Sequence, residues 1–188
     1  VDMLAASRVT KRKAAETMPH LGPRDAYYAP FAIFHGTGRV PLTMMAFAGG
    51  MHVFPGGSVD AADAGADLAW AGPPAAWWGE VFGADESLGR ALVCAAVRET
   101  FEESGVLLAG PSETELLADV STDEWEEERR SLEAREQSLS ELLARRGLVL
   151  RADLLRPLAH WITPEVESKR FDTRFFLAEM PAGQVCRD

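Results

Sequence analysis

The sequence predicts one α/β domain, and three observations favour this fold class. The chain has 188 residues, 47% of them hydrophobic, which is enough to bury a single core. Helical patterns with capping residues occupy its middle. Segments with strand-like composition lie on either side of these patterns, at residues 26–35 and from residue 148 onward. We therefore expect a domain over residues 26–188, preceded by an N-terminal tail or helix over residues 1–25.

The first predicted helix begins near Asp85 or Ser87, either of which can act as its N-cap, and ends at Gly105. Four apolar side chains on one side of this helix are expected to face the core: Leu88, Leu92, Ala95 and Ala96.

A second, long amphipathic helix is predicted over residues 122–147. Ser121 and Glu124 have the spacing of a capping box, and Gly147 is suited to end the helix. An apolar stripe recurs every seven residues at Trp125, Leu132 and Leu139. We expect the helix to dock on its own domain, and a contact in a homodimer is the alternative.

Two strands are predicted near the end of the chain, at residues 157–162 and 170–178. Side chains alternate along a strand, so Arg170, Asp172 and Arg174 share one face. The two arginines could reach a phosphate together, although the default interpretation is that they are solvated charges on the strand.

Three carboxylates on the first predicted helix carry the strongest functional signal. Glu99, Glu102 and Glu103 stand at i, i+3 and i+4, which places them on one face of a helix. Like charges this close raise one another's pKa unless a cation lies among them. Magnesium prefers oxygen ligands. The cluster therefore predicts a site for Mg²⁺ or Mn²⁺ rather than a solvated face.

These carboxylates belong to a longer ordered motif. Arg98 directly precedes Glu99, Gly105 follows the cluster, and a Phe-Pro-Gly-Gly turn ends upstream at Gly57. The set resembles the Nudix box, the signature of hydrolases that cleave a nucleoside diphosphate linked to another group. The resemblance extends over residues 46–181 and implies an α/β/α sandwich with a mixed sheet.

Two departures from the family pattern point to one subgroup. The family has its arginine fourteen residues after the glycine, whereas Arg98 stands 41 residues after Gly57. The family's first glutamate, eight residues before the arginine, falls on Arg90 and is expected to be missing. The split Nudix box of the peroxisomal coenzyme A diphosphatases and their bacterial relatives departs in the same way. Residues 61–86 are therefore interpreted as an insertion that is at least partly ordered and lies beside the catalytic helix, with Trp77 or Trp78 buried.

The motif assigns roles to individual residues. The expected catalytic residues are Arg98, Glu99, Glu102 and Glu103. The three glutamates are expected to bind the metal, with Glu99 alternatively acting as the general base, and Arg98 orients the carboxylates. Gly56 and Gly57 let the backbone approach the metal and substrate closely. Arg170 and Arg174 are candidates for substrate binding, and a base on a later loop could be Glu165, Glu167 or Glu179.

The composition and net charge exclude several classes of binding partner. The net charge of −10 disfavours nucleic acid, because a nucleic-acid binder needs a basic surface. No apolar run approaches membrane-spanning length and the N-terminus lacks a secretory pattern, so no membrane partner is expected. Cys94 and Cys186 lack metal-type spacing and favour a reduced, cytoplasmic protein. A small nucleotide stays possible as substrate, since bound metal ions would dominate the local field.

The expected function is metal-dependent hydrolysis of a nucleoside diphosphate linkage. The resemblance implies coenzyme A or acyl-coenzyme A as substrate, with 3′,5′-ADP and the phosphopantetheine compound as products. Three alternatives remain open: another dinucleotide such as NADH or ADP-ribose, a non-catalytic nucleotide-binding domain, and an interaction module that uses residues 123–146. Members of the family usually continue with another acidic loop and a helix, so part of the fold is expected to lie beyond this chain.

Overall fold

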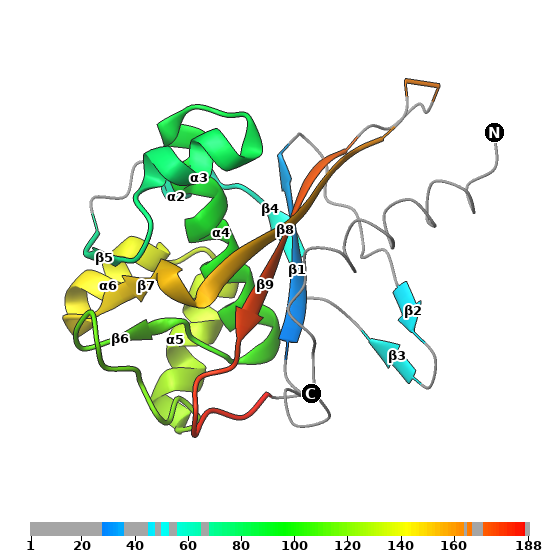
Figure 1. Cartoon of the computed structure of the whole chain (residues 1–188). Coiled ribbons are helices and arrows are strands. Elements are labelled where there is room, and N and C mark those ends of the chain that lie inside the picture. The colour runs from blue at the N-terminus through cyan, green and yellow to red at the C-terminus, as the bar shows by residue number, and fades with distance from the viewer. Residues whose placement is uncertain are drawn as a thin grey trace.

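The computed structural model describes residues 28–35, 45–47, 50–52, 56–64, 68–163, 165–166 and 171–186. The predicted N-terminal tail and Arg170 lie outside these ranges. Within them a mixed sheet and a group of helices lie side by side (Figure 1). The expected α/β fold with a mixed sheet is confirmed.

The main sheet has the strand order β4-β1-β9-β8. Its strands are β1 (Tyr28–His35), β4 (Gly56–Ser58), β8 (Leu155–Ile162) and β9 (Asp172–Glu179). β1 runs parallel to β4 and antiparallel to β9, and β8 pairs antiparallel with β9. The two strands predicted near the end of the chain are thus confirmed as a long hairpin, which extends away from the helices (Figure 1).

Two smaller sheets complete the described strands. One has the order β5-β7-β6, and the other is the antiparallel pair β2-β3. Their bounds are Met45–Phe47 for β2, Gly50–His52 for β3, Trp70–Ala71 for β5, Ala109–Gly110 for β6 and Val149–Arg151 for β7. A short 3₁₀ turn, η1 (Ala152–Leu154), leads from β7 into β8.

Helix α4 (Glu86–Ser104) is the predicted catalytic helix, and its ends confirm the sequence expectation. The Asp85 side chain accepts a hydrogen bond from the backbone N–H of Leu88 at 2.8 Å. Gly105 ends the helix with a positive φ of 70°, a conformation that glycine adopts without steric cost. The helix packs against α3 and against β1 and β4 of the main sheet.

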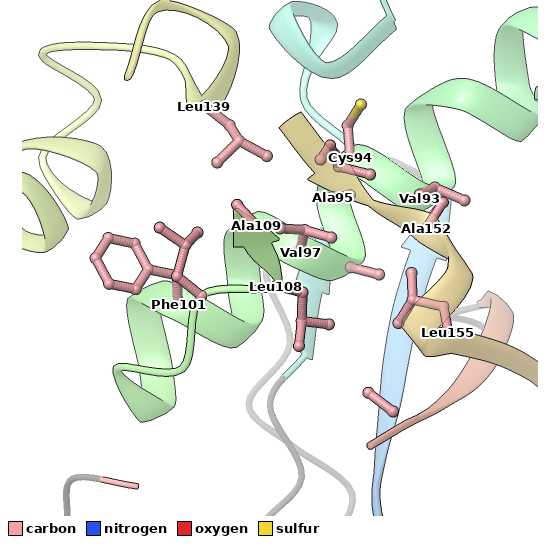
Figure 2. Close-up of a cluster of buried hydrophobic side chains, with 14 of the residues drawn as sticks. Val93, Cys94, Ala95, Val97, Phe101, Leu108, Ala109, Leu139, Ala152 and Leu155 are labelled. Carbon is pink, nitrogen blue, oxygen red and sulfur yellow. The ribbon is translucent and has the colours of Figure 1, made fainter. Parts of the chain in front are cut away.

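The core surrounds the middle of α4, where residues 91–97 are all buried. Leu92, Ala95 and Ala96 are fully buried as predicted, and Leu88 packs partly buried beside them. Figure 2 shows apolar residues of α4 together with Leu108 of the loop before β6 and side chains from β6, α6, η1 and β8, namely Ala109, Leu139, Ala152 and Leu155. Burial of this segment fixes α4 against the rest of the domain and leaves its motif residues at the edge of the core.

The segment predicted as an insertion forms part of this packing. It contains α2 (Ala61–Ala64), β5 and α3 (Ala75–Phe82). Trp78 is fully buried and stacks on Phe82, whereas Trp77 is 39% exposed. A Cβ on Gly89 of α4 would come within 2.5 Å of the Gly79 nitrogen of α3, so the two helices approach as closely as glycines allow. The prediction of an ordered segment with a buried tryptophan beside the catalytic helix is confirmed.

The single long helix predicted over residues 122–147 is wrong, because the structure has two helices there. These are α5 (Asp123–Glu133) and α6 (Leu139–Arg146), which turn back on each other between residues 134 and 138. Arg135 breaks the helix with a positive φ of 59°. The leucines of the two helices, Leu132, Leu139, Leu142 and Leu143, are buried in the core of this domain, and Trp125 packs partly buried against it, which confirms docking on the domain itself.

The capping box is also placed differently from the prediction. Thr122, not Ser121, is the N-cap of α5, and its side chain makes no capping hydrogen bond. The capping box belongs to α6, where Ser138 accepts from the Glu141 backbone N–H and the Glu141 side chain accepts from the Ser138 backbone N–H. This second start signal stabilises the break between the two helices.

Candidate active site

Arg98 lies at the centre of the candidate site, with all three guanidinium nitrogens engaged. Nε and Nη2 donate to the two carboxylate oxygens of Asp63, each at 3.2 Å. Nη2 also donates to the Ser58 carbonyl at 2.9 Å. Nη1 donates to Glu99 Oε1 at 2.8 Å and to the Glu102 carboxylate at 3.0 and 3.2 Å. Arg98 therefore ties the β4–α2 segment to two carboxylates of its own helix.

Gly57 leaves the space that the Glu99 carboxylate occupies. A Cβ at this position would overlap the Glu99 carboxylate group, so any side chain here would displace it. The sequence predicts that the backbone at this turn comes close to the metal and the substrate. In the structure, the group that lies against the turn is the Glu99 side chain of α4. Gly56 precedes it in β4 and pairs with Ala32 of β1.

Asp63 is a site residue that the sequence analysis did not identify. It stands six residues after Gly57, which is the family's spacing between the glycine and the first glutamate. The carboxylate expected to be missing at Arg90 has a counterpart in Asp63, which binds Arg98, whereas Arg90 forms an ion pair with Glu86 at 3.8 Å in the first half of α4. The family's first glutamate lies six residues after the glycine and eight before the arginine. The first spacing leads from Gly57 to Asp63, whereas the second leads from Arg98 to Arg90. The insertion therefore begins after Asp63.

Burial shifts the carboxylates around Arg98 toward their neutral forms. It raises the pKa of Asp63, Glu99 and Glu102 in each case, even though Arg98 acts in the opposite direction. Burial alone would lower the pKa of Arg98, but the carboxylates raise it overall. One arginine thus shares its charge among three buried carboxylates, which leaves the cluster short of positive charge.

The donor set suits a hard divalent cation. Glu99 and Glu102 point to Arg98, while Glu103 is exposed, and the described part of the chain holds no group of three or more His, Cys, Asp or Glu side chains already placed around one metal position. The donors available on this face of α4 are carboxylate oxygens, which Mg²⁺ and Mn²⁺ prefer. A cation would also relieve the raised pKa values, because it favours the charged form of each group.

Arg174 lies on the row of the sheet that contains Gly57. Ile33 of β1 pairs with Gly57 on one side and with Arg174 on the other, which places Arg174 two strands, about 10 Å, from the glycine turn. Its side chain is 4% exposed, so the default interpretation as a solvated strand charge is wrong for Arg174. Nη1 forms an ion pair with Asp172 at 2.6 Å, and Nε has no hydrogen-bond partner in the described structure. Asp172 also contacts His160 of β8.

Of the residues considered as a base on a later loop, Glu165 and Glu179 make no hydrogen bond or ion pair with the Arg98 cluster in the described structure. Glu165 is exposed in the turn after β8, and Glu179 is exposed at the end of β9. Glu179 stands five residues from Arg174 along that strand, which corresponds to about 17 Å. Glu167 lies outside the described residues.

Comparisons with known proteins agree with the motif. A glycine turn that faces an Arg-Glu-Thr-Phe-Glu-Glu helix in a mixed α/β fold is the arrangement on which the Nudix resemblance rests. The sequence matches the NUDT19 Nudix domain over residues 85–186, more than half of the chain. The chain therefore belongs to the Nudix hydrolases and, within them, to the family of the NUDT19 Nudix domain.

Similar proteins include two vertebrate enzymes and one bacterial structure. The acyl-coenzyme A diphosphatase NUDT19 of Gallus gallus is 30% identical over 166 residues, covering 67% of this chain and 43% of the relative. Its counterpart in Xenopus laevis is 27% identical over 170 residues, covering 72% and 44%. The crystal structure of a Nudix hydrolase from Alicyclobacillus acidocaldarius matches with a TM-score of 0.56 and 30% identity, covering 86% of this chain and 71% of that one. The chain thus spans less than half the length of the two vertebrate relatives.

Proposed function

We propose that this chain hydrolyses the diphosphate linkage of coenzyme A or acyl-coenzyme A, with Mg²⁺ or Mn²⁺ as cofactor. Water adds to one phosphorus, the P–O–P bridge breaks, and the products are 3′,5′-ADP and (acyl)phosphopantetheine. The observation that carries the proposal is the sharing of Arg98 by three buried carboxylates, which favours a bound cation. The relatives named acyl-coenzyme A diphosphatase support the choice of substrate.

The residues of α4 take separate roles in this proposal. Glu99, Glu102 and Glu103 hold the cation, and Arg98 keeps Glu99 and Glu102 oriented. When bound, the cation neutralises the diphosphate and increases the acidity of a water molecule. The alternative role of Glu99 is to accept that proton instead of binding the cation.

Residues of the main sheet would contact the substrate. The backbone of Gly56 and Gly57 borders the carboxylates, and Arg174 offers a buried guanidinium on the same row of the sheet. We include Arg170 as a second substrate-binding candidate from the sequence pattern alone. The contact of Asp63 with Arg98 supports a catalytic domain over a non-catalytic one, since it adds a carboxylate to the glutamates of α4.

The remaining assignments are proposals of the same kind. No helix in the described part of the chain is long and apolar enough to cross a membrane. Cys94 is buried in α4, and burial raises the pKa of its thiol to about 12, which agrees with an unreactive core position. We propose a cytoplasmic protein that acts on a small nucleotide, and the homodimer stays a prediction.

A panel of nucleotides tests the proposed function. The protein is incubated with Mg²⁺ and coenzyme A, acetyl-coenzyme A, NADH, ADP-ribose or a nucleoside triphosphate, and the products are resolved by mass. We expect the highest kcat/KM for the coenzyme A compounds, with 3′,5′-ADP among the products. Faster cleavage of NADH or ADP-ribose would assign the chain to another dinucleotide, and no cleavage of any compound would contradict the proposal.

A further inference from the structure

Three arginines of the described part of the chain, Arg98, Arg129 and Arg135, lie around the candidate site, and they differ in how firmly the fold holds them. Every guanidinium nitrogen of Arg98 is hydrogen-bonded within the cluster. Arg129 of α5 donates to the Glu102 carbonyl at 2.5 Å and to both carboxylate oxygens of Glu126. Neither can turn toward a substrate without breaking these contacts.

Arg135 is held far more loosely. Its Nη1 lies 3.5 Å from Asp60 Oδ2, and its side chain is 64% exposed. Asp60 is itself 34% exposed, so the pair is a long, solvated ion pair that a stronger anion can replace at little cost. Of the three guanidinium groups, that of Arg135 is the one available for a ligand.

The position of Arg135 is at the edge of the candidate active site. Asp60 stands three residues after Gly57, in the short connection between β4 and α2. The ion pair with Asp60 therefore places the Arg135 guanidinium beside the connection that follows the glycine turn.

The backbone at Arg135 is unusual for an arginine. The residue directly follows the C-cap of α5 and has a φ of 59°, a left-handed conformation in which a Cβ is strained and glycine is favoured. The turn alone would be more stable with glycine. A strained residue beside a catalytic cluster indicates that its side chain has a use other than forming the turn.

We propose that Arg135 is a substrate-binding residue, which exchanges Asp60 for a phosphate of the nucleotide when the substrate enters. The inference deepens the proposed function and rests on it, since it identifies the cation that receives the diphosphate next to the metal-binding carboxylates. Arginine suits this role because its planar guanidinium can bind two phosphate oxygens at once. The turn between α5 and α6 would then form part of the substrate site.

Kinetics of two substitutions test this proposal. Arg135→Gln and Arg135→Gly should each raise the KM for coenzyme A about tenfold, the loss expected from one hydrogen bond to a charged group, with a smaller change in kcat. Arg135→Gly should also raise the melting temperature, because it relieves the left-handed strain. Stability and affinity would then move in opposite directions, which a purely structural role cannot produce.

Arg130→Gln is the matched control. Arg130 lies on α5, five residues before Arg135. It is 70% exposed and pairs with Glu126, so the Arg130→Gln variant should have the same KM as the parental protein. Calorimetric binding of inorganic pyrophosphate with Mg²⁺ gives a readout that does not need turnover. Its affinity should fall about tenfold in both Arg135 variants.

The outcomes separate this inference from the proposed function. Unchanged KM and unchanged pyrophosphate affinity in both variants of an active protein would overturn the role of Arg135 alone. A parental protein that cleaves no compound of the panel, yet binds pyrophosphate through Arg135, would overturn the proposed reaction and support the binding role.

Discussion

Two clusters of arginine and glutamate in this molecule have opposite charge balances. In the α5–α6 hairpin, the single carboxylate of Glu128 accepts hydrogen bonds from Arg145 at 2.6 and 2.8 Å and from Arg146 at 2.6 Å. Gln137 adds a further donor at 2.8 Å. These hydrogen bonds, that of Arg145 foremost, lower the pKa of Glu128 to about 2.

The cluster around Arg98 contains the same residue types in the reverse proportion. One arginine serves Asp63, Glu99 and Glu102, and burial raises the pKa of all three. A carboxylate with a surplus of cations is a stable structural contact, whereas buried carboxylates with too few cations are costly until a further positive charge arrives. Perturbed groups of the second kind gather at functional sites, and this difference supports the proposal that the Arg98 cluster is the active site.

The largest effect is expected from a substitution in the acidic cluster itself. Glu102→Gln should reduce kcat/KM with saturating Mg²⁺ by on the order of 100-fold or more, because a charged oxygen ligand is lost. The melting temperature should not fall, since the carboxylate removed is buried with a raised pKa. Steady-state kinetics and thermal unfolding measure the two effects. Glu113→Gln, in an exposed loop, is the control. Near-parental turnover of Glu102→Gln would contradict the prediction and place the metal site elsewhere.

A smaller effect is expected from a substitution of Asp63, the residue of α2 that binds Arg98. Asp63→Asn keeps a hydrogen-bond acceptor for Arg98 but removes the charge that balances it. Arg98 should then draw Glu99 and Glu102 more strongly, and Mn²⁺ affinity should fall about 10-fold to 100-fold, the range typical of residues that orient metal ligands. Titration with Mn²⁺ checks this prediction. Parental affinity in the variant would show that Asp63 only fixes the fold.

The two regions also differ in how much the sequence could predict. The ends of α4 were predicted correctly because Asp85 and Gly105 act on their immediate neighbours. The α5–α6 hairpin was missed because a seven-residue repeat of apolar side chains fits one long helix as well as two packed ones. The break occurs at Arg135, where the sequence offers no glycine, and the Ser138–Glu141 capping box was the available signal.

The candidate site shows the same limit in another form. The spacing of Glu99, Glu102 and Glu103 is local, so the sequence could place them on one helix. Asp63 and Arg98 are 35 residues apart, and they meet only because α2 folds against α4. Arg135 reaches the β4–α2 connection from a different helix pair, which periodicity cannot reveal. Contacts of this kind depend on tertiary packing and not on any local pattern.

The structural cluster should respond in the opposite way to substitution. Glu128→Gln leaves Arg145 and Arg146 without their shared carboxylate and should lower the free energy of unfolding by about 2 kcal/mol. The kcat/KM of the folded variant should stay within about twofold of the parental value, because no atom of Glu128 contacts the Arg98 cluster among the described hydrogen bonds. Denaturant unfolding and kinetics at the same temperature test both parts. A stable variant with impaired turnover would reverse the assignment of the two clusters.

The smallest effect is a pH dependence that isolates the charge of Glu128. Folding lowers the pKa of this carboxyl from its ordinary value of 4.5 to about 2, so its contribution to stability is fully present above pH 4.5 and is lost as the pH falls toward 2. Glutamine does not titrate, and the difference in unfolding free energy between the parental protein and Glu128→Gln should therefore be constant near neutral pH. Below pH 4.5 this difference should shrink, as the parental protein takes up a proton on unfolding that the variant does not. Unfolding in denaturant across this pH range measures the difference directly. If the difference in unfolding free energy stays constant down to about pH 2, Arg145 and Arg146 are held by the geometry of the hairpin and not by the charge of Glu128.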